Sequence, residues 1–528
     1  MAKLLCIASN EIESIGDEEL SSRIREMREF CSATLTMETR ARQTKALRGV
    51  SDILRNGTRT QLQLVGPRDI VFCVVKILFY FEDGLHGAEG ACDWKRRRDY
   101  RIARACYHDL LRSFVPEQSV RVVRSLVEVV HGERLWHWED LCWDLALGLL
   151  ECGIGGASIA HALLDRVEAE TTAVRDARAI VRMLYEILDI YSWPKSEESV
   201  EAVERLLGLY RDSLSGGKAD EPRPRAPLRK GLEVCVRHAI KHLANEHLVL
   251  VIRRMCSWSV DDETTDGRIL DFGSTLEYAA YMHESRLYRD TFDKELFDVL
   301  MRMLSSSSRL VSLLGNRVIQ YLIDRRGNRS QFDTPKIFFE GMQFDLKINE
   351  CVKEDKYFLQ RKREIFHDGI LSSMMNHCSS RLNLECTYCT VCLIAVEVPC
   401  GFTAAALVCL AMNFQDVTFE RSDMRREASY HIHATVMAVM SLLCWIHEAK
   451  VFYSYVNKIM TERAQWAPHL NPPIKARYSF AVHHVLWDKP ELFFVDWEAR
   501  YGLWKCFRHR ESQQRSREED SKKSRSSA

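Results

Sequence analysis

The stretch Val-Arg-Val-Val-Arg-Ser-Leu-Val-Glu-Val-Val at residues 120–130 decides the fold class. Its residues Val123, Leu126, Val127 and Val130 follow the spacing i, i+3, i+4, i+7, which places them on one face of an α-helix. The same period returns along the chain, at residues 138–150, 173–190, 200–214, 232–244, 248–258, 276–287, 292–304, 310–323, 357–375, 384–396, 402–412, 428–446 and 451–460. We therefore expect an all-α protein built from successive amphipathic helices.

The composition favours the same fold class. The 528 residues include 24 glycines and 12 prolines, roughly 4.5% and 2.3% of the chain against usual values of about 7% and 5%. Because β-rich folds need both residues at their many turns, the shortage favours long helices with few corners. Apolar residues make up 46% of the chain, and 74 basic residues balance 74 acidic ones. The chain can thus bury a large core, and its zero net charge gives no overall attraction to nucleic acid or anionic lipid.

The expected helices recur in pairs about every 35 to 45 residues, which is the spacing of helical-hairpin repeats. The best linker signal is Gly216-Gly217, followed by prolines at 222, 224 and 227. These features predict six regions: polar N-terminal peripheral helices at 1–60, an N-terminal helical repeat domain at 61–215, a Pro/Gly linker at 216–228, a C-terminal helical repeat domain at 229–470, an aromatic-rich C-terminal cap at 471–507 and a disordered charged Ser/Arg tail at 508–528.

This chain of non-identical helical pairs resembles an armadillo- or HEAT-type α-solenoid. The resemblance covers residues 68–465 and is strongest at 401–466. It implies a curved superhelix that binds partners along a concave face. An irregular multi-helix bundle would give the same series of helices, so it stays open as the alternative.

The 18 cysteines favour a reducing compartment over a disulfide framework. Several lie inside apolar helical patterns, as Cys106, Cys142 and Cys235 do, where a free thiol packs as a small apolar residue. The apolar run Leu4–Ala8 is shorter than the apolar core of a signal peptide. We therefore expect a cytoplasmic protein, with the nucleus as the alternative.

Two further signals concern helix boundaries. The most membrane-like stretch, residues 391–412, is interrupted by Glu397 and Pro399. It predicts two buried helices that meet at a corner, and no membrane span, because a span needs about 20 apolar residues. The sequence Asp333-Thr334-Pro335 is typical of a helix start, with a capping residue before a proline in the first turn.

The densest group of metal-ligand residue types lies between residues 377 and 409. Zinc takes four thiolate or imidazole ligands, and a Cys-x2-Cys pair is the usual half-site. Here three cysteines are spaced i, i+3, i+6 in a helical apolar stretch, and no second pair follows at finger spacing. Buried thiols on a helix are favoured over metal binding, which stays open. The group comprises His377, Cys378, Cys386, Cys389, Cys392, Cys400 and Cys409.

Three short motifs each lack a member that their chemistry needs. The triplet at 271–273, Asp-Phe-Gly, has no kinase catalytic loop upstream, so we interpret it as a glycine that ends a helix. The acidic run 262–267 resembles a calcium loop, but Gly273 stands where its bidentate Glu belongs. The glycines at 153–156 follow a helical pattern instead of a strand and lack the Lys-Ser/Thr ending of a phosphate loop, so they predict a helix–helix corner.

The histidine pair His238 and His242 stands at i, i+4, but the Glu of a metalloprotease helix is missing after His238. Core or surface packing is therefore the favoured role of these histidines. From the motifs together, the sequence predicts no catalytic, cofactor-binding or metal-ligating residue and no cofactor.

The function favoured by these observations is a non-catalytic helical scaffold or adaptor that binds other proteins. One alternative is an RNA- or nucleic-acid-associated helical protein, since short basic runs occur at 95–98, 361–363 and 515–517. The other is an enzyme whose nucleophile and base converge from distant positions.

The aromatic block 478–507 is expected to pack on the last helices, with partner binding as the alternative. Serines 512, 516, 521 and 524 of the tail are candidates for phosphorylation.

Overall fold

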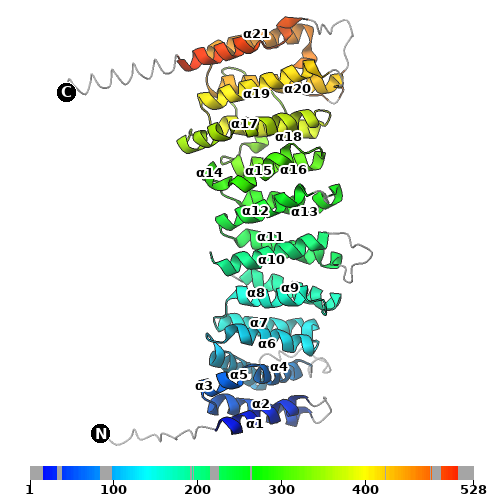
Figure 1. Ribbon diagram of the computed structural model, residues 1–528, viewed down its shortest axis with the longest axis vertical. Coiled ribbons are helices and arrows are strands. Elements are labelled where there is room, and N and C mark those ends of the chain that lie inside the picture. The colour runs from blue at the N-terminus through cyan, green and yellow to red at the C-terminus, as the bar shows by residue number, and fades with distance from the viewer. Residues whose placement is uncertain are drawn as a thin grey trace, which may run out of the picture. The chain divides into compact units, whose positions relative to one another are not determined.

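The computed structural model describes residues 16–32, 39–83, 98–190, 193, 195–214, 225–261, 265–421, 424–475, 477–478 and 489–508 (Figure 1). Within these residues every regular element is an α-helix or a short 3-10 helix, and no strand occurs. The expected all-α fold is therefore confirmed. The chain divides into two compact units, unit 1 at Met1–Ala244 and unit 2 at Asn245–Ala528.

Unit 1 is an array of helices that begins at Asp17. Its helices are α1 (Asp17–Ser32), α2 (Thr39–Asn56), α3 (Arg59–Val65), α4 (Arg68–Asp83), α5 (Arg98–Phe114), α6 (Ser119–Gly132), η2 (Leu135–His137), α7 (Glu139–Glu151), α8 (Gly156–Glu168), α9 (Val174–Ile190), α10 (Glu197–Leu214), η3 (Ala226–Leu228) and α11 (Arg229–His242). In α6 the predicted stripe is the buried one, since Val123, Leu126, Val127 and Val130 are all less than 10% exposed.

Two layers of helices make up most of unit 1. Helices α4, α6, α8 and α10 pack in succession in one layer, and α5, α7, α9 and α11 do so in the other. Because α11 packs against both α9 and α10, the helices on either side of the expected 216–228 linker belong to the same unit. Residues 216–224 of that linker lie outside the described residues. The domain boundaries drawn from the sequence stay predictions.

Unit 2 continues with helices and one long segment without regular secondary structure, residues 333–352. Its helices are α12 (Asn245–Ser259), α13 (Asp266–Met282), α14 (Tyr288–Thr291), α15 (Lys294–Leu304), α16 (Arg309–Ile323), η4 (Arg329–Phe332), α17 (Lys353–Asn376), α18 (Arg381–Glu397), α19 (Gly401–Glu420), α20 (Arg426–Ile446), α21 (Lys450–Trp466), η5 (Pro468–Leu470) and η7 (Pro490–Leu492). Residues 496–508 form a further helix, called the C-terminal helix below.

Two layers again organise unit 2. Helices α12, α15, α17 and α19 pack in succession in one layer, and α13, α16, α18 and α20 do so in the other. Within this unit Figure 1 shows the helices stacked in pairs, as an array of helical hairpins requires. The layers meet in a core that includes a buried polar network, where Asn316 Nδ2 donates to Ser373 Oγ (2.8 Å) and Thr390 Oγ1 donates to Asn316 Oδ1 (2.9 Å).

Two expected corners are confirmed. The glycines at 153–156 connect α7 to α8, and Gly153 has a positive φ of 82°, which favours glycine at that turn. Residues 398–400 separate α18 from α19, so the apolar stretch 391–412 forms parts of two packed helices. Helices α19 and α20 are long and apolar enough to cross a bilayer by length and composition alone, but 50% and 83% of their apolar windows are buried inside the protein.

Two expected helix boundaries are wrong. The 271–273 triplet does not end a helix, because α13 begins at Asp266 behind the cap Thr265 and buries Phe272 against Trp258. No helix starts at 333–335 either. The chain from residue 333 to residue 352 forms no regular element. It buries Phe338 against Trp445, with ring centroids 6.3 Å apart, and the next helix begins at Lys353. In both places tertiary packing of an aromatic ring overrides the local capping signal.

Candidate functional site: an apolar groove and an exposed aromatic row

An apolar groove of about 570 Å³ lies between α17 and α19 in unit 2. Its floor consists of aliphatic and aromatic side chains, namely Leu359, Phe366, Ile370, Ile394, Phe402, Leu407 and Leu410. Small side chains on the α19 wall, Ala405, Ala406 and Cys409, keep the groove open because they fill little of the space between the two helices. An open apolar groove between helices is a common place for a binding site.

The charged groups that line this groove all belong to α17. Arg363 and Glu364 form an ion pair of 3.0 Å at the surface, and Asp368 lies one turn further along the helix. His367 Nε2 lies 2.8 Å from Asn413 Nδ2 of α19, which ties the two walls together. The groove therefore offers an apolar floor and a charged edge of both signs.

The C-terminal helix carries an exposed row of aromatic rings beside the groove. Trp497, Tyr501 and Trp504 are 65%, 47% and 51% exposed, with successive ring centroids 5.4 and 5.8 Å apart. Their spacing of four and three residues places them on one helical face. Arg500 Nη2 lies 3.8 Å from Sγ of Cys409, which lines the groove, so the row and the groove are neighbours. We call the groove and this row together the C-terminal apolar surface.

The opposite face of the C-terminal helix is packed. Ala499 and Leu503 are buried, Gly502 lies against Phe452 of α21, and Phe507 lies against Gly401 of α19. The aromatic block expected to cap the last repeat thus divides into two faces, one that packs and one that is open to solvent. Trp487, another ring of that block, lies outside the described residues.

A buried arginine holds the segment that leads into the C-terminal helix. Arg463 of α21 is fully buried, and its guanidinium donates to the carbonyl oxygens of Leu492 (2.6 Å), His433 (3.1 Å) and Leu470 (3.0 Å). Burial lowers the pKa of Arg463 to about 9. Three carbonyl acceptors from three separate elements make this side chain a connection between α20, α21 and the C-terminal segment.

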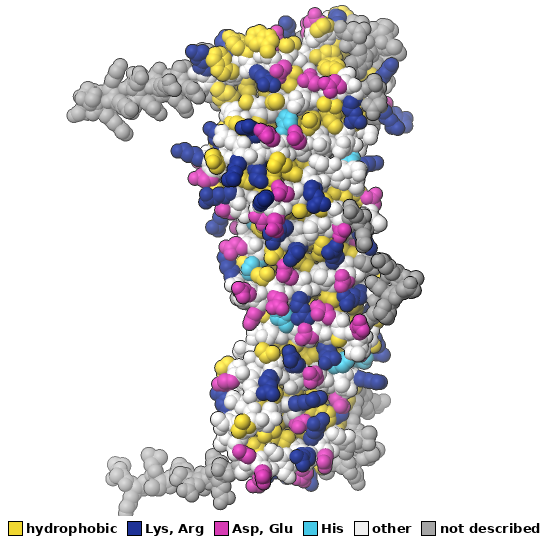
Figure 2. All heavy atoms as spheres, viewed as in Figure 1, with side chains coloured by type: hydrophobic (Ala, Val, Ile, Leu, Met, Phe, Trp, Pro, Cys, Tyr) yellow, Lys and Arg dark blue, Asp and Glu magenta, His cyan; other side chains and the backbone are white. Residues whose placement is uncertain are grey.

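On the face shown in Figure 2, side chains of both charges are mixed over each unit, and hydrophobic side chains gather toward the C-terminal end of unit 2. The exposed hydrophobic residues of unit 2 include Tyr357 and Ile365 of α17 and Phe419 of α19, in addition to the aromatic row. Large contiguous apolar patches on a protein surface usually mark interaction sites.

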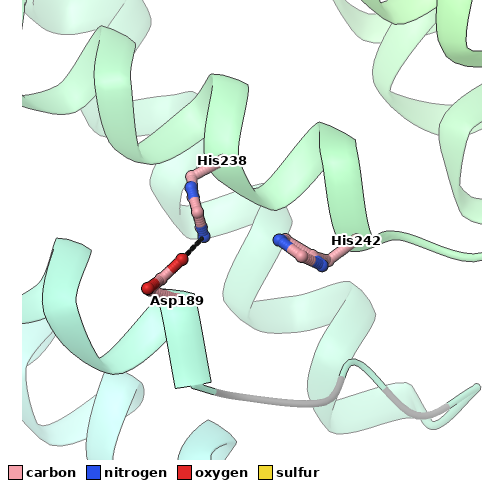
Figure 3. Close-up of side chains that lie close together, drawn as sticks. All are labelled: Asp189, His238 and His242. Carbon is pink, nitrogen blue, oxygen red and sulfur yellow. Dashed lines mark ion pairs between the residues drawn. The ribbon is translucent and has the colours of Figure 1, made fainter.

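In unit 1 the structure adds a third residue to the histidine pair. His238 and His242 of α11 lie one helical turn apart, with ring centroids 4.8 Å apart. Asp189, in the last turn of α9, places Oδ1 2.9 Å from His238 Nε2 (Figure 3). Asp189 could not be predicted from the sequence, because nothing in its local pattern connects it to residues about 50 positions away. Burial lowers the pKa of His238, and the charge of Asp189 acts in the opposite direction.

Three of the cysteines singled out from the sequence, Cys386, Cys389 and Cys392, lie together on α18. Cys389 and Cys392 are buried on α18, and burial raises the pKa of each thiol. Cys386 accepts a hydrogen bond from Gln320 Nε2 (3.2 Å), and burial raises its pKa to about 11. Among the described residues, the one group of three potential ligands that converges is Asp189, His238 and His242.

A family model described as EFR3, armadillo repeat, matches residues 24–483 of the chain. The chain belongs to the EFR3 armadillo-repeat family. This assignment agrees with the layered helical pairs of both units and confirms the armadillo-type resemblance seen in the sequence.

Individual EFR3 relatives are distant. The chain is 22% identical over 151 residues to protein EFR3 homolog B of Mus musculus and 23% identical over 154 residues to that of Homo sapiens. Each alignment covers 28% of this chain and 18% of the relative's own length. Among solved structures, an engineered protein from the Northeast Structural Genomics Consortium aligns over 91% of this chain and 98% of its own, with 11% identity and a TM-score of 0.27.

Proposed function

We propose that this protein is a non-catalytic scaffold whose C-terminal apolar surface binds an amphipathic helix of a partner protein. The observation that carries the proposal is the apolar groove between α17 and α19, with its floor of aliphatic and aromatic side chains. Membership in an armadillo-repeat family supports it, because stacked helical repeats characteristically bind partners along extended surfaces.

The form of the groove favours a helix as the bound element. Two neighbouring helices of one layer bound the groove, and an amphipathic helix can lay its apolar face into such a space. The exposed Trp497 and Trp504 extend the apolar area beyond the groove, and tryptophan is among the residues that contribute most to binding energy at interfaces. The paired charges at the edge would then contact the polar flanks of the bound helix.

The nucleic-acid alternative has weaker support. Within the basic run 361–363, Lys362 lies over the ring of Phe297 at 4.7 Å and Arg363 pairs with Glu364 at 3.0 Å. These contacts partly satisfy two of the three cations, whereas phosphate binding needs Lys and Arg free and clustered on one face.

The free cysteines of the described residues support a reducing location, and we propose the cytoplasm, with the nucleus as the alternative.

Site-specific photocrosslinking tests the proposed surface. A photoreactive side chain at Ala406, inside the groove, should crosslink the partner, whereas the same side chain at Asn457, exposed on α21, should not. The purified partner should then bind the Ala406→Arg variant at least about tenfold more weakly, a loss of about 1.4 kcal/mol, because the substitution places a charge over the apolar floor.

The matched control is Asn457→Arg, which adds the same side chain at an exposed position of the same unit and should leave the affinity unchanged. Circular dichroism of both variants should match that of the wild type. Equal crosslinking at both positions, or a wild-type affinity for Ala406→Arg, would contradict the proposed surface.

A further inference from the structure

We propose that Asp189, His238 and His242 form a binding site for a divalent first-row transition metal, with Zn²⁺ as the best match. The proposal concerns unit 1 and is independent of the partner-binding surface proposed above. It stands on the convergence of three ligand types from two helices that pack against each other, α9 and α11.

The two histidines supply the ligand pair that a helix can present most simply. Residues at i and i+4 lie on the same helical face, so His238 and His242 project side by side from α11 (Figure 3). Pairs of histidines at this spacing are used by proteins to hold zinc, with a third ligand from another element. Here the third ligand is the carboxylate of Asp189, which lies in the last turn of α9 beside this face.

The distances fit a site that closes by small side-chain rotations. The ligand atoms all lie within 4.8 Å of one another, and the Asp189 and His238 atoms are 2.9 Å apart. A tetrahedral metal with bonds of about 2.0–2.2 Å sets its ligand atoms about 3.3–3.6 Å apart. His242 and Asp189 are both exposed, so each can turn toward the metal without repacking the core.

His238 provides the fixed point of the site. Its side chain is only 11% exposed, and the ring of Tyr185, one turn before Asp189 on α9, contacts it edge-to-face at 5.1 Å. Its Nε2 atom is buried and has no hydrogen-bond partner of proper geometry among the described residues, although Asp189 Oδ1 is close. This arrangement, a buried ring nitrogen that faces a carboxylate without a good hydrogen bond, is the one expected of two ligands that bind the same metal ion.

The types of ligand atom indicate which metal ions the site would favour. Two imidazoles and one carboxylate suit Zn²⁺ and its neighbours Co²⁺ and Ni²⁺, whereas Ca²⁺ and Mg²⁺ prefer a shell of oxygen atoms. Three protein ligands leave the fourth position of a tetrahedral ion open. Since two of the ligands are solvent-exposed, water or a side chain from another protein can take that position.

Cobalt spectroscopy on the full chain under reducing conditions tests the site. Co²⁺ should produce the visible absorption bands of a four-coordinate ion with nitrogen and oxygen ligands, without the near-ultraviolet charge-transfer band of thiolate ligands. One Zn²⁺ ion per chain should displace the bound Co²⁺. The variants His242→Ala and Asp189→Asn, both at exposed positions, should each weaken Zn²⁺ binding at least tenfold.

The matched control is His137→Asn. His137 pairs with Asp176 at 3.5 Å in the same unit but belongs to no group of three converging ligand residues among those described, so its removal should leave metal binding unchanged. Zn²⁺ should also raise the melting temperature of the wild type and of this control, and not that of His242→Ala. Thiolate bands alone, or an unchanged affinity in the His242→Ala/Asp189→Asn double variant, would overturn the proposal.

Discussion

At the scale of single residues, Arg463 shows how a buried charge can organise a chain terminus. Its guanidinium lies among apolar side chains and serves three backbone carbonyls, those of Leu492, His433 and Leu470. Hydrogen bonds from a charged donor are stronger than neutral ones, and removing a buried partner leaves the acceptors unsatisfied.

We expect Arg463→Ala to lower the free energy of unfolding of unit 2 by at least about 3 kcal/mol, because three carbonyls lose their donor and a large cavity remains. Urea unfolding followed by tryptophan fluorescence measures this loss. Arg302→Met is the matched control, since the exposed Arg302 donates to a single carbonyl, that of Val260, at 3.4 Å. A loss of unfolding free energy as small as that of the control would show that the C-terminal segment does not depend on Arg463.

Glu397 predicts a pH dependence. Burial raises its pKa to about 7, an effect that Asp324 reinforces and that Asn349 and Arg325 oppose. A carboxyl group with a raised pKa binds its proton more tightly when folded, so its contribution to stability falls as the pH rises from about 4.5 to about 7. The stability of the wild type relative to Glu397→Gln should therefore decrease by about 2.5 kcal/mol between pH 5 and pH 8.

Unfolding of both proteins at the two pH values measures this difference. The Gln side chain keeps the acceptor for the backbone N–H of Arg325, which lies 3.2 Å from the carboxylate. If the difference between wild type and variant is the same at pH 5 and pH 8, Glu397 titrates as an ordinary carboxyl.

At the scale of helices, close packing in unit 1 depends on a glycine. A Cβ atom at Gly148 of α7 would lie 2.4 Å from Cε1 of Tyr107 on α5, and Tyr107 is itself buried with its hydroxyl donating to the Leu145 carbonyl at 2.8 Å. The missing side chain therefore allows α5 and α7 to approach each other.

Gly148→Ala should cost about 1–3 kcal/mol of stability, because the ring must move within a packed core. Gly208 is an exposed position inside α10, and a Cβ atom added there would have no neighbouring atom within 4 Å. The same change at Gly208 should therefore stabilise by about 0.5–1 kcal/mol through helix propensity alone. Thermal unfolding compares the two variants. If both Gly148→Ala and Gly208→Ala stabilise the protein, the contact between α5 and α7 does not require a glycine at position 148.

The helices themselves were predictable where a long apolar stripe is buried. The stripe of α6 and the corners at 153–156 and 398–400 follow from the spacing of apolar residues and glycines in the sequence. The start of α13 and the irregular segment 333–352 do not follow from such spacing. Their conformation is set by rings that pack against distant helices, as Phe338 does against Trp445, and such contacts leave no local signal.

At the scale of the whole molecule, the sequence predicted the class of protein better than its sites. Helical period, few glycines and few prolines lead directly to a helical repeat protein. The groove could not be predicted, because it depends on which faces of α17 and α19 lie next to each other within their layer. The same holds for Asp189, which reaches the histidine pair only through the packing of α9 on α11.

Hydrogen exchange of the protein alone and in complex with its partner tests directly whether the C-terminal apolar surface binds that partner. Binding should slow exchange in α17, α19 and the C-terminal helix and leave exchange in the helices of unit 1 unchanged. The Ala406→Arg variant should show no such protection at the same partner concentration. Protection confined to unit 1, or protection of α17 and α19 that survives in the variant, would contradict the assignment of the C-terminal apolar surface as the partner-binding site.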